Sequence, residues 1–357
     1  MLDDHGSDGS GAVTPRRRRR NSRRRRLPGF RGRCFHPAFH LIVARIAFAF
    51  SFDRDTIGTE AGLDWLEIVL GFDCNCRCRV CPSGEQPRGF MPLEEAERLC
   101  LWGRERGATG LWLGGGEPTL YPHLFDLVTL ARRLGYERIR LQTNGLMLAY
   151  EKFAERLAGA GVDTVAFSLK GAGADSHDWV TRRPGGFELV TKGVRNAGKH
   201  LDRIEADVLV TSRCLPELDS LVAGFAGLGV AEFVLWWPST HGLSDKVSAT
   251  RLVPRFSEGA DALSRAFDAA DVAGVGMTSL HTPPCALPEG IRDRYRPSSF
   301  WNLYVATPGG EPFRAEESPM EGGVFLQGCS ACSHRRSCLG LRRDYLDAFG
   351  ADEFRPL

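Results

Sequence analysis

Six short apolar runs alternate with longer amphipathic stretches between residue 65 and about residue 240, and this rhythm limits the fold more than any other feature of the sequence. The runs have the Val, Ile, Leu and aromatic content of strands buried on both faces. They are Trp65–Leu70, Gly110–Leu113, Arg138–Gln142, Thr164–Leu169, Ile204–Val210 and Glu232–Trp236. Between them, the pattern predicts helices near residues 92–106, 122–134, 149–160, 187–200 and 216–227. Strand–helix alternation of this kind predicts an α/β fold of right-handed parallel units, here a partial (β/α)6 barrel of TIM type.

The rhythm weakens beyond residue 240. Pro283-Pro284 and Pro297 indicate a boundary before a smaller segment that carries several cysteines. We therefore expect three parts. Residues 1–60 form a disordered Arg-rich extension, residues 61–273 form the barrel, and residues 274–357 form a small Cys-rich α+β extension.

The charge of the chain is divided unevenly. Residues 1–60 hold thirteen Lys/Arg and six Asp/Glu, a net charge of +7, whereas the remaining residues hold thirty-three and thirty-eight, a net charge of −5. The run Arg16–Arg26 cannot bury a core and is predicted to be disordered. Nucleic-acid contact and a twin-arginine export signal are two functional interpretations of this segment. The third, which we adopt, is a dispensable N-terminal extension.

Eleven cysteines is a high number for 357 residues. Most are clustered at short spacings without a clear signal peptide, which favours metal ligation in a reducing cytoplasm over disulfides. Cys100 shares a helical stripe with Leu93, Ala96 and Leu99, so it is expected in the core. No apolar stretch is long enough to span a membrane.

Polar residues follow the predicted strand ends. Loops at the carboxyl ends of parallel barrel strands meet on one rim and build the site there, so we expect these residues to converge. They are Cys74–Cys81 after the first strand, Gly114-Gly115-Gly116-Glu117-Pro118 after the second, Thr143-Asn144-Gly145 after the third, Ser168 and Lys170 at the fourth, and Thr211 and Ser212 after the fifth.

The first of these loops has the spacing C-x-x-x-C-x-x-C, carried by Cys74, Cys78 and Cys81. Three thiolates on one short loop suit a [4Fe-4S] cluster, which normally takes four cysteines, so one iron would stay open for a ligand. Cys76 is interpreted as a spacer, because C-x-C-x-C would bring the thiols closer together. A structural zinc site is the alternative, but zinc prefers paired ligand sets and no partner pair lies nearby in the sequence.

In this order the motifs resemble the radical SAM superfamily, over residues of about 65–240. The resemblance implies that the open iron binds the amino and carboxylate groups of S-adenosylmethionine. It also implies that the turn at Gly114, Gly115, Gly116 and Glu117 receives the methionine amino group, that Asn144 belongs to the cofactor site, and that Ser168 binds the ribose hydroxyls. Val80 departs from the family, whose members often carry an adenine-contacting aromatic residue at this position.

A second cysteine set lies near the C-terminus. Cys329, Cys332 and Cys338 have the spacing C-x-x-C-x-x-x-x-x-C, and Cys285 lies upstream. The set resembles the auxiliary-cluster extensions called twitch or SPASM domains. Because position 342 is Arg where the longer SPASM pattern has another cysteine, we expect one auxiliary [4Fe-4S] cluster with four thiolate ligands. A zinc site in which His334 or Cys285 completes the three cysteines is the alternative.

The resemblance implies reductive cleavage of S-adenosylmethionine to a 5'-deoxyadenosyl radical, followed by hydrogen abstraction from a substrate carbon. It also implies an external electron donor of the flavodoxin or ferredoxin type. Our first expectation is the oxidative modification of a peptide or protein; the alternative is a tailoring enzyme or dehydrogenase for a small molecule. A third hypothesis, a protein that binds or modifies nucleic acid through the Arg-rich segment, is less favoured. No catalytic side chain is assigned; His177, Lys170, Cys214 and Tyr295 are further site groups or packing residues.

Overall fold

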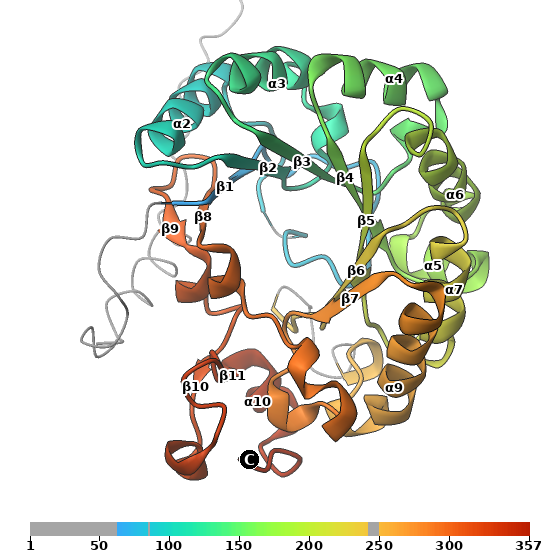
Figure 1. The fold of residues 1–357 in the computed structure, drawn as a ribbon, viewed down its shortest axis with the longest axis vertical. Helices are drawn as coiled ribbons and strands as arrows, with labels where there is room; N and C mark the ends of the chain where they lie inside the picture. The colour runs from blue at the N-terminus through green and yellow to red at the C-terminus, as the bar shows by residue number, and fades with distance from the viewer. Residues whose placement is uncertain (1–62, 85, 242–249) are drawn as a thin grey trace, which may run out of the picture.

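The computed structural model describes residues 63–84, 86–241 and 250–357. The Arg-rich segment and Cys34 lie outside the described residues. The framework is a nine-stranded sheet in the order β7-β6-β5-β4-β3-β2-β1-β8-β9, in which only β9 pairs antiparallel. Figure 1 shows the sheet curving around an interior, with the helices on its outer side.

All six strands expected from the sequence are present. They are β1 (Trp65–Val69), β2 (Gly110–Gly114), β3 (Arg138–Thr143), β4 (Thr164–Leu169), β5 (Arg203–Leu209) and β6 (Glu232–Trp236). Neighbours pair in parallel in chain order from β1 to β6. The prediction of a partial barrel of parallel strands is therefore confirmed.

The five expected helices are also present, and the structure adds others. The expected ones are α2 (Leu93–Glu105), α3 (Leu124–Arg133), α4 (Glu151–Ala160), α6 (Gly186–Ala197) and α7 (Leu218–Ala226). The additional ones are α5 (Ala174–Thr181), α9 (Phe256–Ala273) and α10 (Arg343–Phe349). Cys100 of α2 is fully buried among core side chains, as its helical stripe predicted.

The sheet extends beyond the six expected strands. β7 (Gly276–Ser279) continues it next to β6, and β8 (Leu303–Ala306) pairs in parallel with β1 on the other side. β9 (Phe313–Arg314) follows β8 at the edge, and β10 (Gly323–Val324) and β11 (Leu341–Arg342) form a separate two-stranded sheet. Strands from the Cys-rich segment thus belong to the same sheet as the first strand of the barrel.

The main hydrophobic core lies between the sheet and the helices. The alternate residues of β1, β3 and β5 that contribute to it are fully or almost fully buried, for example Leu66, Ile139 and Ala206. On α6, Val190, Val194 and Ala197 lie on the face that packs against this core, at the spacing of an amphipathic helix. No helix among the described residues has the length and apolar character needed to cross a bilayer.

Candidate functional site

Three loops meet at the carboxyl edge of the sheet, as the sequence predicted. The loop after β1 and the turn after β2 are joined by backbone hydrogen bonds, from Gly116 N to Gly71 O (2.8 Å) and from Glu117 N to Asp73 O (2.8 Å). The loop after β3 joins them through side chains. The structure therefore places the cysteine loop and the glycine turn in direct contact.

The glycines of this turn are required by that contact. Gly115 has a φ of +118°, and a Cβ there would lie 2.6 Å from Gly71 O. A Cβ on Gly116 would lie 2.4 Å from Asp73 O. Any larger residue would push the cysteine loop away. The glycines are thus needed for packing between two loops of this chain, in addition to the cofactor contact implied by the resemblance.

The Glu117 carboxylate connects the loops after β2 and β3. It is 1% exposed; its Oε1 accepts hydrogen bonds from Thr119 N (3.0 Å) and Thr143 Oγ1 (2.6 Å), and its Oε2 accepts one from Asn144 N (2.8 Å). Burial raises the pKa of Glu117, while the hydrogen bonds from Thr119, Thr143 and Asn144 oppose that rise. Both carboxylate oxygens therefore hold the loops in place.

Asn144 extends this connection to the cysteine loop. Its Nδ2 donates to Asn75 Oδ1 at 2.7 Å and lies 3.8 Å from Cys74 Sγ and 3.6 Å from Cys76 Sγ. Its Oδ1 accepts from Leu146 N at 3.1 Å, which fixes the orientation of the amide. Asn144 is thus a neighbour of the predicted ligand thiols.

The thiols of the cysteine loop lie within electrostatic reach of one another. A hydrogen bond from the Cys76 thiol lowers the pKa of Cys78 to about 6, against the effect of burial and with help from Lys170. A hydrogen bond from Cys76 also lowers the pKa of Cys74. Burial raises the pKa of Cys81, and the charges of Cys78 and Cys74 add to the rise. The lowered pKa values favour thiolates at Cys74 and Cys78, and Cys81 lies within electrostatic reach of both.

Cys76, interpreted from its spacing as a residue that is not a ligand, lies next to two of the predicted ligands. Its side chain is buried and interacts with Cys74 and Cys78. Among the described residues, no group of three or more His, Cys, Asp or Glu is arranged to hold a single metal ion. A four-iron cluster differs from a single ion, because each thiolate binds a different iron.

Helix α5, absent from the sequence prediction, supports the cysteine loop from the side. Arg77 N and Arg79 N donate to the carbonyls of Thr181 (3.1 Å) and Val180 (2.8 Å). Val80 is 2% exposed and packs in a small apolar cluster with Val180 and Leu252. The residue that departs from the family pattern therefore has a packing role in this chain.

Ser168 and Lys170, the polar residues predicted at the end of the fourth strand, lie near β5 and the cysteine loop. Ser168 lies at the end of β4 in register with Asp207 of β5, and its carbonyl accepts a hydrogen bond from Lys170 Nζ at 3.1 Å. The Lys170 side chain is buried, and its charge acts on both Cys78 and His177. Burial, with Lys170, lowers the pKa of His177 to about 3. Lys170 therefore belongs to the environment of the cysteine loop.

Two of the further candidates are packing residues. Cys214 is fully buried in the main core, where burial raises its pKa. The Tyr295 hydroxyl accepts a hydrogen bond from Leu339 N at 3.4 Å, and burial raises its pKa. Tyr295 lies beside the second cysteine set, because the charge of Cys338 contributes to that rise.

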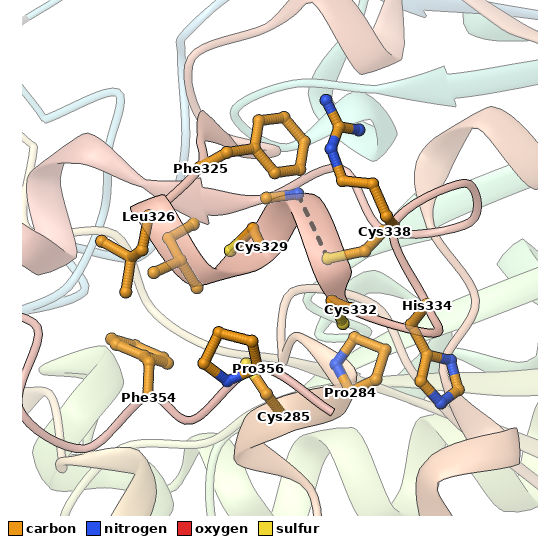
Figure 2. Close-up of a pocket in the computed structure, with 13 residues that line it drawn as sticks. Pro284, Cys285, Phe325, Leu326, Cys329, Cys332, His334, Cys338, Phe354 and Pro356 are labelled. Carbon is orange, nitrogen blue, oxygen red and sulfur yellow. Dashed lines mark hydrogen bonds between the residues drawn. The ribbon is translucent and has the colours of Figure 1, made fainter.

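The second cysteine set is brought together by the fold. Cys285, Cys329, Cys332 and Cys338 come from three separate turns and line one pocket, together with His334 (Figure 2). Burial raises the pKa of Cys285 to about 12, and the charges of Cys338, Cys329 and Cys332 add to the rise. Gly340 N donates to Cys338 Sγ at 3.3 Å, the dashed line of Figure 2. The fold thus brings four thiols to one pocket, which suits a cluster in which each thiolate binds a different iron better than a single ion.

Sequence reasoning missed the polar groups on the inner face of the barrel. Arg140 donates to Asp207 and Glu205 there, and Gln142 and Trp236 also donate to Asp207. The signal was the alternation of polar and apolar residues along β3 and β5, which the apolar content of the strands obscured.

Comparison with known families covers the part of the chain that carries these loops. A model of the radical SAM superfamily matches residues 68–215. That range begins within β1 and includes the cysteine loop, the glycine turn and the loop after β3.

Two curated relatives illustrate the sequence similarity. The chain is 29% identical over 181 residues to the AdoMet-dependent heme synthase of Methanosarcina barkeri, covering 50% of this chain and 51% of the relative. It is 32% identical over 183 residues to the probable GTP 3',8-cyclase of Methanopyrus kandleri, covering 49% of this chain and 56% of the relative. The chain spans about half the length of the curated relatives it matches.

Solved structures match over a larger share of the chain. SuiB of Streptococcus suis bound to S-adenosylmethionine has a TM-score of 0.58 and 16% identity, over 82% of this chain and 76% of that chain. Native anSMEcpe with bound AdoMet has a TM-score of 0.58 and 17% identity, over 82% of this chain and 93% of that chain. At these identities the similarity shows the fold alone. The family comparison thus places its match on the three loops at the rim: residues 68–215, which carry them, match the radical SAM superfamily.

Proposed function

We propose that this chain is an enzyme that cleaves S-adenosylmethionine reductively and uses the resulting 5'-deoxyadenosyl radical to abstract hydrogen from a substrate carbon. The observation that carries the proposal is the direct connection of three loops at the carboxyl edge of the barrel: backbone hydrogen bonds join Gly116 to Gly71, and Glu117 joins Thr143 and Asn144. An arrangement so specific to one rim is what a reaction centre in a barrel requires.

Each group of site residues has its own proposed role. Cys74, Cys78 and Cys81 would hold a [4Fe-4S] cluster with one open iron, which supplies the electron and chelates S-adenosylmethionine. Gly115 and Gly116 keep the turn against the cysteine loop, and the backbone of this turn would receive the methionine moiety. Asn144 orients the loop beside the thiols, and Ser168 lies on the rim where the ribose would bind.

We propose a peptide or protein as the substrate. SuiB, which shares the fold at a TM-score of 0.54 in its complex, was solved bound to its precursor peptide SuiA. A small molecule is the second candidate, because the curated relatives at about 30% identity are named as a heme synthase and GTP 3',8-cyclases. Nothing among the described residues favours nucleic acid, and residues 61–357 carry a net charge of −5. An external flavodoxin- or ferredoxin-type electron donor and a cytoplasmic location are part of the proposal.

The C-terminal cysteines support net oxidation. Cys285, Cys329, Cys332 and Cys338 would close a second [4Fe-4S] cluster with no open iron, suited to accept the electron that remains after hydrogen abstraction. We accordingly propose residues 274–357 as an auxiliary-cluster segment of the twitch or SPASM kind, which follows the barrel of residues 61–273 and adds strands β7, β8 and β9 to its sheet. Zinc in the same pocket, with His334 as an available ligand, would remove the basis for net oxidation.

The reaction is tested by anaerobic incubation of the iron-reconstituted chain with S-adenosylmethionine and a chemical reductant. We expect formation of 5'-deoxyadenosine and methionine in equal amounts, measured by liquid chromatography. Binding of S-adenosylmethionine without cleavage by a fully reconstituted cluster would refute the proposal. The substrate class is tested by adding short peptides or nucleotides prepared in deuterated form, since deuterium transfer into deoxyadenosine identifies the molecule that lost hydrogen.

A further inference from the structure

The two faces of the barrel sheet have opposite character. Residues that point toward the helices are apolar core residues, whereas the alternate residues carry charged, amide and indole groups. The polar and indole side chains of this second set include Glu67 of β1, Trp112 of β2, Arg140 and Gln142 of β3, Glu205 and Asp207 of β5, and Trp236 of β6. An interior built only for stability would be filled with branched apolar side chains, so this face indicates a binding site.

The positive charge on this face is already balanced. The Arg140 guanidinium donates to both oxygens of Asp207 (2.9 and 3.0 Å) and to Glu205 (2.9 Å). Glu205 also accepts from Arg203, at 2.7 Å. Arg140 lies 4.0 Å from the centroid of the Trp112 ring, so this wall already accommodates one cation. The Arg140 Nη1 atom has no hydrogen-bond partner, and the charge of Arg140 also lowers the pKa of Glu67.

Two acidic side chains near this network have no basic partner from Lys or Arg among the described residues. Glu67 has its pKa raised to about 7 by burial, with Asp207 and Glu321 adding to the rise and Arg140 opposing it. Glu321 pairs only with His281, its Oε1 lying 3.1 Å from His281 Nε2, while its Oε2 is buried without a partner. The two carboxyl groups are thus close enough to repel each other, and neither forms an ion pair with a Lys or Arg side chain of the described residues.

Polar atoms without partners lie in the same region. The Trp112 Nε1 donor and the His281 Nδ1 atom are buried without a hydrogen-bond partner, and the side chain of His281 is 4% exposed. A Cβ on Gly114 would lie 2.9 Å from Glu67 Oε1 and 3.5 Å from both Trp112 Nε1 and Gln142 Oε1. These three polar atoms therefore lie together beside Gly114. Buried polar atoms without partners are costly, and a ligand is one way to satisfy them.

The far side of this region is aromatic. The Trp236 ring packs edge-to-face on His281 with centroids 5.0 Å apart, and on Trp112 with centroids 6.3 Å apart. Indole rings beside carboxylates form the combination that attracts an organic cation.

We propose that the inner face of the barrel binds the positively charged group of a substrate, with Glu67 and Glu321 as its counter-ions and Trp112 and Trp236 as its walls. This inference rests on the proposed function and names the substrate class of that site, an ammonium or guanidinium compound. The unpartnered Trp112 N–H calls for an oxygen acceptor on the same molecule. A basic amino-acid residue within a peptide meets both requirements.

The experiment uses Nα-acetyl-lysine amide as the probe and Nα-acetyl-norleucine amide as its neutral counterpart. Binding to the reconstituted full chain is measured by titration calorimetry at pH 7 in phosphate and in Tris, whose ionisation enthalpies differ. We expect the lysine probe to bind at least tenfold more tightly than the norleucine probe. A cation beside Glu67 lowers the pKa of Glu67, which is about 7 in the free chain, so binding should also release protons.

Matched variants locate the effect. Glu67→Gln and Glu321→Gln should each weaken the lysine probe about tenfold or more, and Glu67→Gln should abolish the proton release. Glu151→Gln is the control, because Glu151 is an exposed carboxylate of α4 that pairs with Lys199 on the surface; it should leave binding unchanged. Near-UV circular dichroism identifies any variant that fails to fold. In that case, proton release when the lysine probe binds to the unaltered chain decides whether a cation binds beside Glu67.

Three outcomes would overturn the proposal: equal affinity for the two probes, no saturable binding of the lysine probe, or binding that does not depend on Glu67. The titration is repeated with saturating S-adenosylmethionine. If the lysine probe no longer binds, the carboxylates bind the ammonium group of the cofactor, and a substrate site is refuted. Deoxyadenosine formation by the unaltered chain is measured in parallel, so failure of the radical reaction is seen separately from failure of cation binding.

Discussion

The Glu117 carboxylate accepts a hydrogen bond of 2.8 Å from the backbone N–H of Asn144, which connects the loop after β2 with the loop after β3. Glu117 belongs to a sequence motif that the resemblance assigns to cofactor binding. In this chain the same carboxylate also holds Asn144 beside the cysteine loop. Replacing Glu117 should therefore displace this loop, in addition to removing the cofactor contact that the resemblance implies.

Replacing Glu117 with Ala should weaken S-adenosylmethionine binding about tenfold or more. The change leaves the donors of Thr119, Thr143 and Asn144 without their buried acceptor, at a cost of about 1–3 kcal/mol for each unsatisfied group. Equilibrium dialysis measures the affinity, and iron content serves as the control, because the three proposed ligand cysteines stay in place. Unchanged affinity in the variant would contradict the role given to Glu117.

The variant Gly115→Val should reduce S-adenosylmethionine binding by a different route. A Cβ at this position lies 2.6 Å from Gly71 O, and the φ of +118° disfavours any side chain. The turn must therefore shift away from the cysteine loop. Gly159→Ala is the matched control, since a Cβ there meets nothing within 4 Å; the two variants should differ clearly in cofactor affinity.

Replacing Cys74, Cys78 and Cys81 with Ala should abolish deoxyadenosine formation under reducing, anaerobic conditions, because each thiolate binds a separate iron. Cys76→Ser tests whether the remaining cysteine of the loop is a spacer. If it is, this variant keeps the cluster, which electron paramagnetic resonance of the reduced protein would detect. Deoxyadenosine produced by the triple variant would refute the central assignment.

The unaltered chain, purified anaerobically, should hold about eight iron atoms, four for each [4Fe-4S] cluster. Replacing Cys329, Cys332 and Cys338 should lower this to about four, while uncoupled cleavage of S-adenosylmethionine continues. Conversion of substrate should then fail, because the last electron loses its acceptor. About four irons and one zinc in the unaltered chain would instead identify a zinc site.

Asp344 should contribute to stability, because it connects the C-terminal segment to the barrel. It accepts hydrogen bonds from Ser239 Oγ (2.9 Å) and Thr240 N (2.7 Å), and its Oδ1 lies 3.3 Å from Arg342 Nε. Removing one partner of a buried ion pair costs about 3–5 kcal/mol. Asp344→Ala should lower the free energy of unfolding by about this amount, measured by urea denaturation. Exposed Asp202→Ala is the control.

The pH dependence of this contribution has a defined sign. Burial opposes ionisation, but Arg342 and the hydrogen bonds from Thr240 and Ser239 hold the pKa of Asp344 below its ordinary value. A lowered folded pKa means that the stabilisation is complete above the pKa of unfolded aspartate, about 4, and is lost as the pH falls toward the folded value. The difference between the unaltered chain and Asp344→Ala should therefore shrink below pH 4.

The sequence predicted the strands and the rim because both depend on local patterns. Apolar runs such as Thr164–Leu169 are long and uninterrupted, and the C-x-x-x-C-x-x-C spacing is specific. The strands β7 and β8 have four residues each, too few to produce a periodic signal, and their places depend on pairing with β6 and β1. Helix α5 was missed for a similar reason, since its eight residues include buried polar Ser176 and His177.

The inner face of the barrel was less accessible to sequence reasoning. In the sequence, Glu67 is a single polar residue within an apolar strand. Its proposed role in cation binding depends on its proximity to Glu321, which comes from a loop far along the chain. His281 gains its role only through the same contact. Residues that act through partners distant in sequence carry no local pattern, so only the folded arrangement reveals them.

The pairing of β1 with β8 has a consequence for how the protein is made. Trp65 lies opposite Leu303, so one edge of the first strand stays open until the ribosome has delivered almost the whole described chain. Contacts between such distant residues form slowly, and an open strand edge favours association with other chains. During synthesis, the nascent barrel should therefore depend on chaperones, and chains that stop before residue 303 should aggregate rather than accumulate as folded barrels.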